Sequence, residues 1–117
     1  MFSTLLTLIL ATSTPMVIEE PVSKEVKLIT EVFGKDAPLM IRIASCESSL
    51  HHAVNGKVVE SKTGDSGLFQ INQIHKEELD RLKLNPMKLE DNVKYAKYLF
   101  DKSGVKSWYW SKDCWSK

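Results

Sequence analysis

Apolar residues recur every three or four positions in several stretches of the chain, and this spacing predicts a mainly helical domain. The first helix begins after a suitable N-cap residue, Ser23, and ends at Gly34. Its inward face carries Val26, Ile29, Val32 and Phe33. The second helix is expected to be capped by Asp36, with Pro38 in the first turn, where proline is tolerated.

The second half of the chain predicts two more helical regions. Residues 68–72 are expected to begin a helix, and helical periodicity continues from Ile74 to Leu84, where Asn85-Pro86 interrupts it. The longest helix then ends at Gly104. Its apolar stripe consists of Leu89, Val93, Ala96 and Phe100.

One short segment predicts β structure instead. Asn55-Gly56 lies between the β-favouring residues of 53–59, and this dipeptide is a strong signal for a two-residue hairpin turn. We therefore expect an α+β domain that is mainly α, with one short hairpin.

Glu47 is the residue in this pattern with the clearest chemistry. It shares one helical face with Met40, Ile43 and Ala44, so its carboxyl group projects from an apolar stripe. Burial and the nearby negative end of the helix dipole both disfavour the charged form, and both should raise the pKa of Glu47. A carboxyl group with a raised pKa can act as a general acid near neutral pH. The alternative is a glutamate at the helix end that pairs with a nearby lysine. Pairing within the helix is not expected, because Arg42 is not three or four positions from Glu47.

Three segments resemble the lytic transglycosylases, a branch of the lysozyme-like superfamily. Residues 43–49, Ile-Ala-Ser-Cys-Glu-Ser-Ser, are similar to the catalytic Glu-Ser motif of that family. Residues 61–71 resemble the second motif, a serine that leads into Gly-Leu-Met-Gln. Residues 92–99 are similar to a third motif, an asparagine followed by a small residue and Tyr-Leu. The resemblance extends from Val26 to Trp115.

The resemblance implies a lysozyme-like fold in which the hairpin lies beside the active-site cleft. It implies that Glu47 is the catalytic acid, that Ser61 and Gln70 hydrogen-bond the sugar or its N-acetyl group, and that Tyr98 lies near the acid. Each supporting residue also has a structural alternative. Ser61 could be a turn serine, Gln70 an amide that satisfies the hairpin backbone, and Tyr98 a tyrosine packed on a helix edge. Gly64 and Gly67 are expected to provide positive φ or close approach of the sugar.

Asp65 departs from the usual transglycosylase motif, in which many members carry alanine. The similar string of animal-type lysozymes holds the second catalytic carboxylate there, although some small transglycosylases also have aspartate. The implied activity is cleavage of the β-1,4 bond between N-acetylmuramic acid and N-acetylglucosamine, with formation of 1,6-anhydromuramyl ends. The alternatives are a lysozyme-type hydrolase that uses Glu47 and Asp65, and a non-catalytic wall-binding module. The implied partner is the peptidoglycan glycan strand, bound by a monomer without a cofactor.

Two cysteines, Cys46 and Cys114, suggest a disulfide in an exported domain, with buried free thiols as the alternative. A metal site is not expected, because the cysteines lack ligand spacing and the adjacent His51 and His52 suit a solvated loop. The tail, residues 108–115, shows no helical continuation and is expected to fold back over the helix of Glu47. Its aromatic residues either stack on sugar rings or cover the core: Trp108, Tyr109 and Trp110.

The amino-terminal residues differ in character from the rest. Residues 1–18 carry no charge and contain a short apolar run at 5–11, followed by the small residues Ala11 and Ser13. We interpret 1–22 as a signal peptide or membrane anchor with a linker, and 23–117 as the domain, although no Lys or Arg precedes the apolar run. The protein is therefore expected to be exported. Its net charge of +1 over 117 residues falls short of a nucleic-acid-binding footprint.

Overall fold

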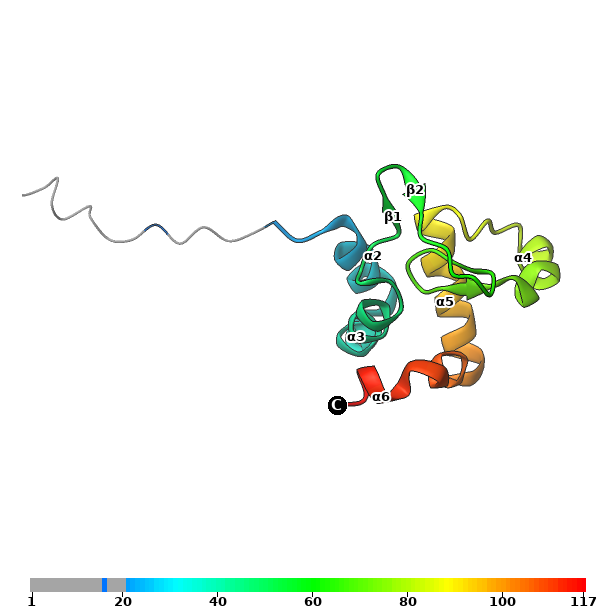
Figure 1. Cartoon of the computed structure of the whole chain (residues 1–117). Helices are drawn as coiled ribbons and strands as arrows, with labels where there is room; N and C mark the ends of the chain where they lie inside the picture. Colours follow the sequence, from blue (N-terminus) through cyan, green and yellow to red (C-terminus); the bar gives the residue numbers. More distant parts are fainter. Residues whose placement is uncertain (1–15, 17–20) are drawn as a thin grey trace, which may run out of the picture.

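The computed structural model describes Met16 and residues 21–117 (Figure 1). The expected signal peptide or anchor, assigned to residues 1–22, lies almost wholly outside the described residues. Within the described part of the chain, no helix is both long and apolar enough to cross a membrane.

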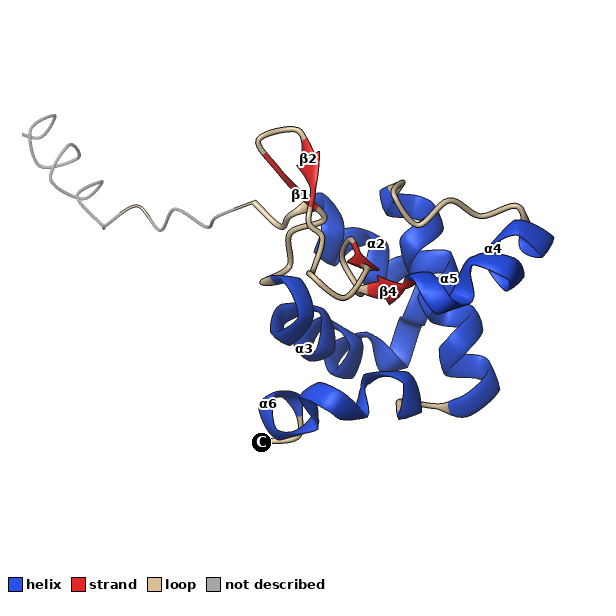
Figure 2. Cartoon of the chain, turned by 45° about the vertical axis from the view of Figure 1, so that its right-hand side comes forward, coloured by secondary structure: helices blue, strands red, loops and turns tan. Residues whose placement is uncertain are grey.

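The described residues form an α+β structure that is mainly helical, with two small antiparallel sheets. The helices are α2 (Lys24–Phe33), α3 (Ala37–Ser48), α4 (Lys76–Leu82), α5 (Leu89–Ser103) and α6 (Lys112–Trp115). The strands are β1 (Ala53–Val54), β2 (Lys57–Val58), β3 (Asp65–Ser66) and β4 (Ile71–Asn72). Short 3₁₀ helices cover Gly34–Asp36, Gln73–His75 and Lys106–Ser111. Figure 2 shows the second sheet in the middle of the molecule, between α3 and the α4–α5 region.

The first predicted helix is confirmed as α2. The hydroxyl of Ser23 accepts a hydrogen bond of 3.2 Å from the backbone N–H of Val26, and Gly34 ends the helix at φ 55°. Ile29 and Phe33 are buried as expected, whereas the two valines of the stripe are only partly buried.

The second predicted helix is α3, but its expected cap is wrong. Asp36 makes no capping hydrogen bond, because the preceding 3₁₀ helix continues directly into α3 and leaves Asp36 in a helical backbone conformation. Met40, Ile43 and Ala44 are fully buried, so the apolar stripe that leads to Glu47 does face the core.

The predicted hairpin is confirmed, but the region after it differs from the prediction. β1 and β2 pair antiparallel around Asn55 and Gly56, both at positive φ, as a type I′ turn requires. Residues 68–72 do not begin a helix. Gly67 and Gln70 adopt positive φ, which stops helix propagation, and Ile71–Asn72 instead pairs with β3.

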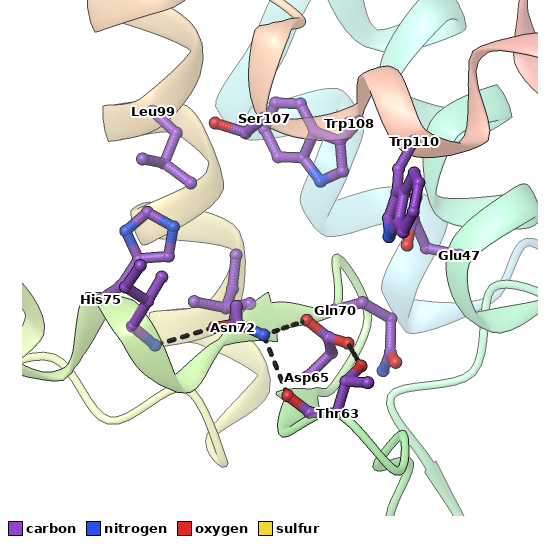
Figure 3. Close-up of a pocket in the computed structure, with 12 residues that line it drawn as sticks. Glu47, Thr63, Asp65, Gln70, Asn72, His75, Leu99, Ser107, Trp108 and Trp110 are labelled. Atoms are coloured by element: carbon purple, nitrogen blue, oxygen red, sulfur yellow. Dashed lines mark hydrogen bonds between the residues drawn. The ribbon is translucent and has the colours of Figure 1, made fainter.

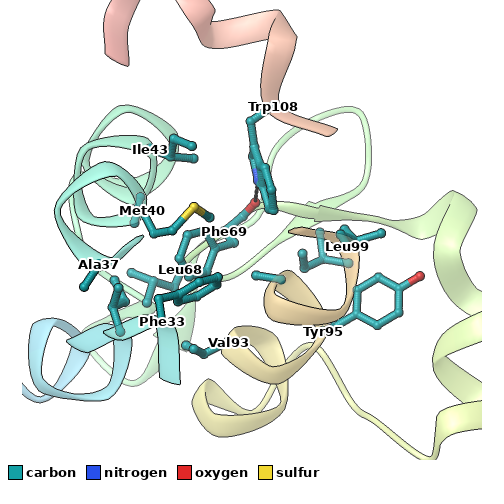
Figure 4. Close-up of a cluster of buried hydrophobic side chains, with 14 of the residues drawn as sticks. Phe33, Ala37, Met40, Ile43, Leu68, Phe69, Val93, Tyr95, Leu99 and Trp108 are labelled. Carbon is teal, nitrogen blue, oxygen red and sulfur yellow. Dashed lines mark hydrogen bonds between the residues drawn. The ribbon is translucent and has the colours of Figure 1, made fainter. Parts of the chain in front are cut away.

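The core lies where α2, α3 and α5 meet the loop between β3 and β4 (Figure 4). The ring of Phe69 lies 5.8 Å from the rings of both Phe33 and Trp108. The indole N–H of Trp108 donates to the backbone oxygen of Phe69 at 3.1 Å, which satisfies two buried polar groups. The tail is thereby attached to the loop that follows β3.

The tail is helical, contrary to the prediction, although it does fold back over α3 as expected. A 3₁₀ helix covers Lys106–Ser111 and α6 follows it. Cys46 and Cys114 form a disulfide with a Cα–Cα distance of 6.1 Å, so the alternative of free thiols is wrong. Arg42 Nε donates to the backbone oxygen of Trp115 at 3.2 Å, and the Trp115 side chain is buried.

Candidate active site

A pocket of about 420 Å³ lies between the end of α3, the second sheet, α5 and the tail (Figure 3). Glu47 comes from α3, Asp65 and Asn72 from the paired strands, Leu99 from α5 and Trp110 from the tail. The predicted β1–β2 hairpin does not line this pocket. The β structure beside the cavity is the β3–β4 pair, which the hydrophobic pattern did not predict.

Glu47 lies partly buried in the last turn of α3. Burial raises its pKa above the ordinary value and the negative charge of Asp65 adds to the rise, although a hydrogen bond from Ser111 acts in the opposite direction. The Ser111 hydroxyl donates to Glu47 Oε2 at 2.5 Å. Among the ion pairs of the described residues, none involves Glu47, so the alternative of a lysine-paired glutamate is not found. The carboxyl group is suited to carry a proton.

The pKa of Asp65 is shifted in the opposite direction. Burial opposes its ionisation, but hydrogen bonds from Ser61, Asn72 and Thr63 outweigh that effect and lower the pKa of Asp65. Ser61 and Thr63 donate to Oδ2 at 2.6 and 2.7 Å, and Asn72 donates to Oδ1 at 2.8 Å. The pocket thus contains one carboxyl group with a raised pKa and one with a lowered pKa.

Ser61 supports Asp65 and does not itself line the pocket. Besides its bond to the Asp65 carboxylate, its hydroxyl accepts hydrogen bonds from the backbone N–H groups of Thr63 and Asp65, at 3.2 and 3.0 Å. This is the local geometry of a turn serine, the alternative that the sequence left open.

Gln70 lines the pocket, but its amide nitrogen is used by the protein. Nε2 donates to the backbone oxygens of Gly67 and Val59, at 2.9 and 3.3 Å. Val59 follows β2, so the amide does satisfy backbone next to the hairpin. Within the described residues, Gln70 Oε1 accepts no hydrogen bond and is available to a ligand donor.

Tyr98 does not line the pocket that contains Glu47. Its hydroxyl donates to the carboxylate of Glu78, and Lys102 lies 5.8 Å from its ring centroid. The neighbouring tyrosine of α5, Tyr95, is the buried one, and its hydroxyl lies 2.9 Å from His75 Nδ1. His75 lines the pocket, so Tyr95 supports the site indirectly.

Asn92, the first residue of the third motif, holds the loop between β3 and β4 in place. Its side chain is fully buried. Oδ1 accepts from the backbone N–H of Phe69 at 2.9 Å, and Nδ2 donates to the oxygens of Ser66 and Pro86 at 2.8 and 2.9 Å. Both the oxygen and the nitrogen of the Asn92 amide hydrogen-bond backbone groups, so the role of Asn92 is to fix the loop.

His52 contacts the same loop, contrary to the expectation of a solvated histidine pair. His51 is exposed, but His52 is 6% exposed. Its Nδ1 accepts a hydrogen bond of 3.1 Å from the backbone N–H of Leu68, so the proton of a neutral ring must lie on Nε2, 2.8 Å from the oxygen of Met87. His52 therefore joins the second sheet to the loop before α5.

Gly67 is required between these two side chains. It has φ 74°, and a Cβ atom there would lie 2.4 Å from Asn92 Nδ2 and 2.5 Å from His52 Cε1. Gly64, at φ 83°, is similarly closed by the Gln73 side chain. The predicted positive φ is confirmed at both positions.

The structure separates the three tail aromatics into different environments. Trp108 is 3% exposed and belongs to the core, whereas Trp110 is 99% exposed at the edge of the pocket. Trp110 and Glu47 both line the pocket, and both are labelled in Figure 3. Tyr109 is exposed but does not line the pocket.

Several site residues were not predicted to have a role: Thr63, Asn72, His75 and Ser111. Thr63 and Asn72 lie inside or next to a quoted motif, so their positions offered a signal. Ser111 belongs to no motif, and its contact with Glu47 spans 64 residues. Within the described residues, no cluster of three or more His, Cys, Asp or Glu is arranged to hold a metal ion.

Comparisons with protein-family models, curated proteins and solved structures found no match to this chain. We therefore infer its function from the chemistry of the pocket and from the resemblance of its motifs.

Proposed function

We propose that the protein is a peptidoglycan lytic transglycosylase with a lysozyme-like fold, and that Glu47 is its single acid–base group. The observation that carries this proposal is the partly buried carboxyl group of Glu47, which has a raised pKa and a hydroxyl neighbour in a cavity of about 420 Å³. An acid in this state can protonate a glycosidic oxygen at a pH where an ordinary glutamate is ionised.

In the first step, Glu47 gives its proton to the oxygen between N-acetylmuramic acid and N-acetylglucosamine, and the bond from that oxygen to C1 of the muramyl residue breaks. The carbonyl oxygen of the muramyl N-acetyl group forms a bond to C1 and neutralises the developing positive charge. The N-acetylglucosamine unit leaves with its new hydroxyl group.

In the second step, the ionised Glu47 removes the proton from the C6 hydroxyl of the same muramyl residue. The C6 oxygen attacks C1 and displaces the N-acetyl oxygen, which closes a 1,6-anhydro ring and returns the proton to Glu47. Water takes no part, and one carboxyl group serves as acid and then as base.

Asp65 has a supporting role in this scheme. Its lowered pKa keeps it negative, so it can stabilise positive charge at C1. The three hydrogen bonds to its two oxygens reduce its capacity to act as a nucleophile. The same hydrogen-bonded, ionised carboxylate also suits the hydrolase alternative, so the products of cleavage distinguish the two reactions.

Trp110 and Gln70 are proposed to bind the glycan. A fully exposed indole at the edge of the pocket can stack on the apolar face of a sugar ring, and the free Gln70 Oε1 can accept from a hydroxyl or N-acetyl N–H. Export agrees with the disulfide, because disulfides persist in oxidising compartments.

A lysozyme-type hydrolase is the second candidate, because the two pocket carboxyl groups have oppositely shifted pKa values. Such a pair is the arrangement expected of an acid and an ionised partner. Under this alternative, Asp65→Asn should nearly abolish cleavage; under the lyase proposal the loss should be mild.

Mass spectrometry of muropeptides released by the purified, oxidised protein tests the proposal. Anhydromuramyl ends without new reducing ends are expected; new reducing ends would instead establish the hydrolase. Glu47→Gln should retain glycan binding and lose cleavage. Binding by both proteins with no cleavage by either would contradict the enzyme assignment and support a wall-binding module.

A further inference from the structure

Ser111 of the tail, directly after Trp110, contacts the pocket residue Glu47 without lining the pocket itself. Its hydroxyl is 2.5 Å from Glu47 Oε2 and 3.3 Å from the backbone oxygen of Trp108, so Glu47 is the closer acceptor. Within the described residues, the side chain of Glu47 has no other hydrogen-bond partner. Its second oxygen, Oε1, is therefore the one left to face a ligand.

We propose that Ser111 is the positioning residue of Glu47: its hydroxyl holds Oε2 and leaves Oε1 as the oxygen that presents the proton. This inference deepens the proposed function, on which its catalytic meaning rests. When the carboxyl group is protonated, a donor at Oε2 favours placing the proton on Oε1, because a protonated oxygen offers a poorer acceptor to the Ser111 hydroxyl. The acidic hydrogen is then directed into the cavity instead of toward the tail.

Ser111 can perform this role because the tail is fixed on both sides of it, to α3 on one side and to the β3–β4 loop on the other. After Ser111, Cys114 is bonded to Cys46, the residue that directly precedes Glu47. Before Ser111, Trp108 is buried and hydrogen-bonded to Phe69. The hydroxyl is therefore held close to the carboxyl group by covalent and packed connections, and little side-chain freedom remains to be lost.

No other described group can take the place of Ser111. Asp65 and His75 line the same pocket from β3 and from the 3₁₀ helix after β4, but neither hydrogen-bonds Glu47. Arg42, on α3 itself, donates to the tail backbone. The charged residues of the elements packed against α3 also make no bond to Glu47: Lys24, Glu25, Lys27 and Glu31 of α2, Lys35 and Asp36 of the preceding 3₁₀ helix, and Lys106, Lys112 and Asp113 of the tail.

The inference is tested with Ser111→Ala, with Ser111→Thr as the variant that keeps the hydroxyl, and with Ser116→Ala as a matched control on the same tail. Carboxyl ¹³C NMR, with Glu47 assigned from Glu47→Gln, measures the titration of Glu47 without requiring activity. Removal of a donor to the ionised form should raise the pKa of Glu47 in Ser111→Ala. The pKa should return toward the wild-type value in Ser111→Thr and stay unchanged in Ser116→Ala.

Glycan cleavage provides the second measurement. In Ser111→Ala, kcat should fall roughly tenfold or more while KM changes little, because a lost hydrogen bond to a charged group disturbs the reacting state more than sugar binding. The alkaline limb of the pH profile should move to higher pH, in line with the raised pKa.

An unchanged titration of Glu47 in Ser111→Ala would overturn the inference, whatever the activity. A loss of kcat in Ser111→Thr equal to that in Ser111→Ala would also overturn it, because the hydroxyl would then be irrelevant. A wild-type protein that cleaves no glycan, while Glu47 still responds to Ser111→Ala, would overturn the proposed function and support the Ser111–Glu47 assignment.

Discussion

Cys46 and Cys114 are joined in a disulfide that ties the tail to α3 at the residue directly before Glu47. The two cysteines are 68 positions apart. The bridge therefore closes a loop that contains both small sheets, α4, α5 and most of the tail. It connects the stability of the fold to the assembly of the pocket, since Trp110 and Ser111 precede Cys114 by only a few residues.

Replacement of both cysteines by serine should lower the free energy of unfolding by about 4 kcal/mol, the chain-entropy value for a loop of this length. Urea denaturation of the double variant and the oxidised wild type measures the difference. Activity should fall more than the unfolded fraction explains, because the tail can then move away from α3. Activity that simply follows the folded fraction would contradict this second part.

The negative charge of Asp65 should add to the effect of burial in placing the upper end of the pH range of activity. Asp65 contributes to the raised pKa of Glu47, so Asp65→Asn should lower that pKa. Glu47 would then lose its proton at a lower pH, and the alkaline limb of kcat/KM should move to lower pH. A limb that stays in place in the variant would show that Asp65 does not influence Glu47, the proposed catalytic acid.

Glu47→Gln should make the protein more resistant to heat near neutral pH. The folded-state pKa of Glu47 lies above its ordinary value of 4.5, so the native state favours the protonated form. The corresponding stability is fully present below the unfolded pKa and is lost as the pH rises through the folded pKa. Glutamine cannot ionise, so the Tm of the variant should exceed that of the wild type at pH 7 and approach it at pH 4.

Gly67→Ala should destabilise the fold by several times as much as the same change in the hairpin. A Cβ at residue 67 would overlap Asn92 and His52, whereas one at Gly56 meets nothing within 4 Å. The two glycines have nearly the same φ, 74° and 76°, so the backbone strain of about 1–2 kcal/mol is common to both. Denaturation of both variants isolates the effect of the overlap. Equal losses would mean that the loop accommodates the extra atom.

Trp110→Ala should weaken glycan binding without loss of stability, because its side chain is 99% exposed. We expect KM for glycan strands to rise about fivefold to tenfold, the effect of one lost stacking contact of about 1 kcal/mol. Tyr109→Ala, at an exposed residue outside the pocket, is the matched control. Trp108→Ala should instead cost about 3–5 kcal/mol of stability, as is typical of a buried aromatic residue. An unchanged KM in Trp110→Ala would exclude sugar stacking at that residue.

Short-range signals in the sequence were sufficient for α2, α3, α5 and the first hairpin, but not for the helical tail. Ser23 and Gly34 delimit α2, and Gly104 ends α5. Asn55-Gly56 forms the turn of the β1–β2 hairpin. These local structures could be predicted because each depends on contacts within a few residues. The sequence also identified Glu47 as a carboxyl group with a raised pKa, since the stripe before it determines which way its helix faces.

The assembled pocket depended on contacts that no local pattern contains. The turn after Gly67 is held by His52 and Asn92, from distant parts of the chain, and these hydrogen bonds override the apparent helical preference of residues 68–72. On α5, the packing against the core decides that Tyr95 is buried while Tyr98 pairs with Glu78.

The sequence by itself thus determined α2, α3, α5, the first hairpin and the acidic group, because helix caps, turns and periodicity act over a few residues. Only the tertiary structure decided that Ser111 hydrogen-bonds Glu47 and that Trp110 borders the pocket. The physical reason is distance along the chain: the tail reaches α3 through a disulfide and buried tryptophans, whose energies arise only once both segments are folded.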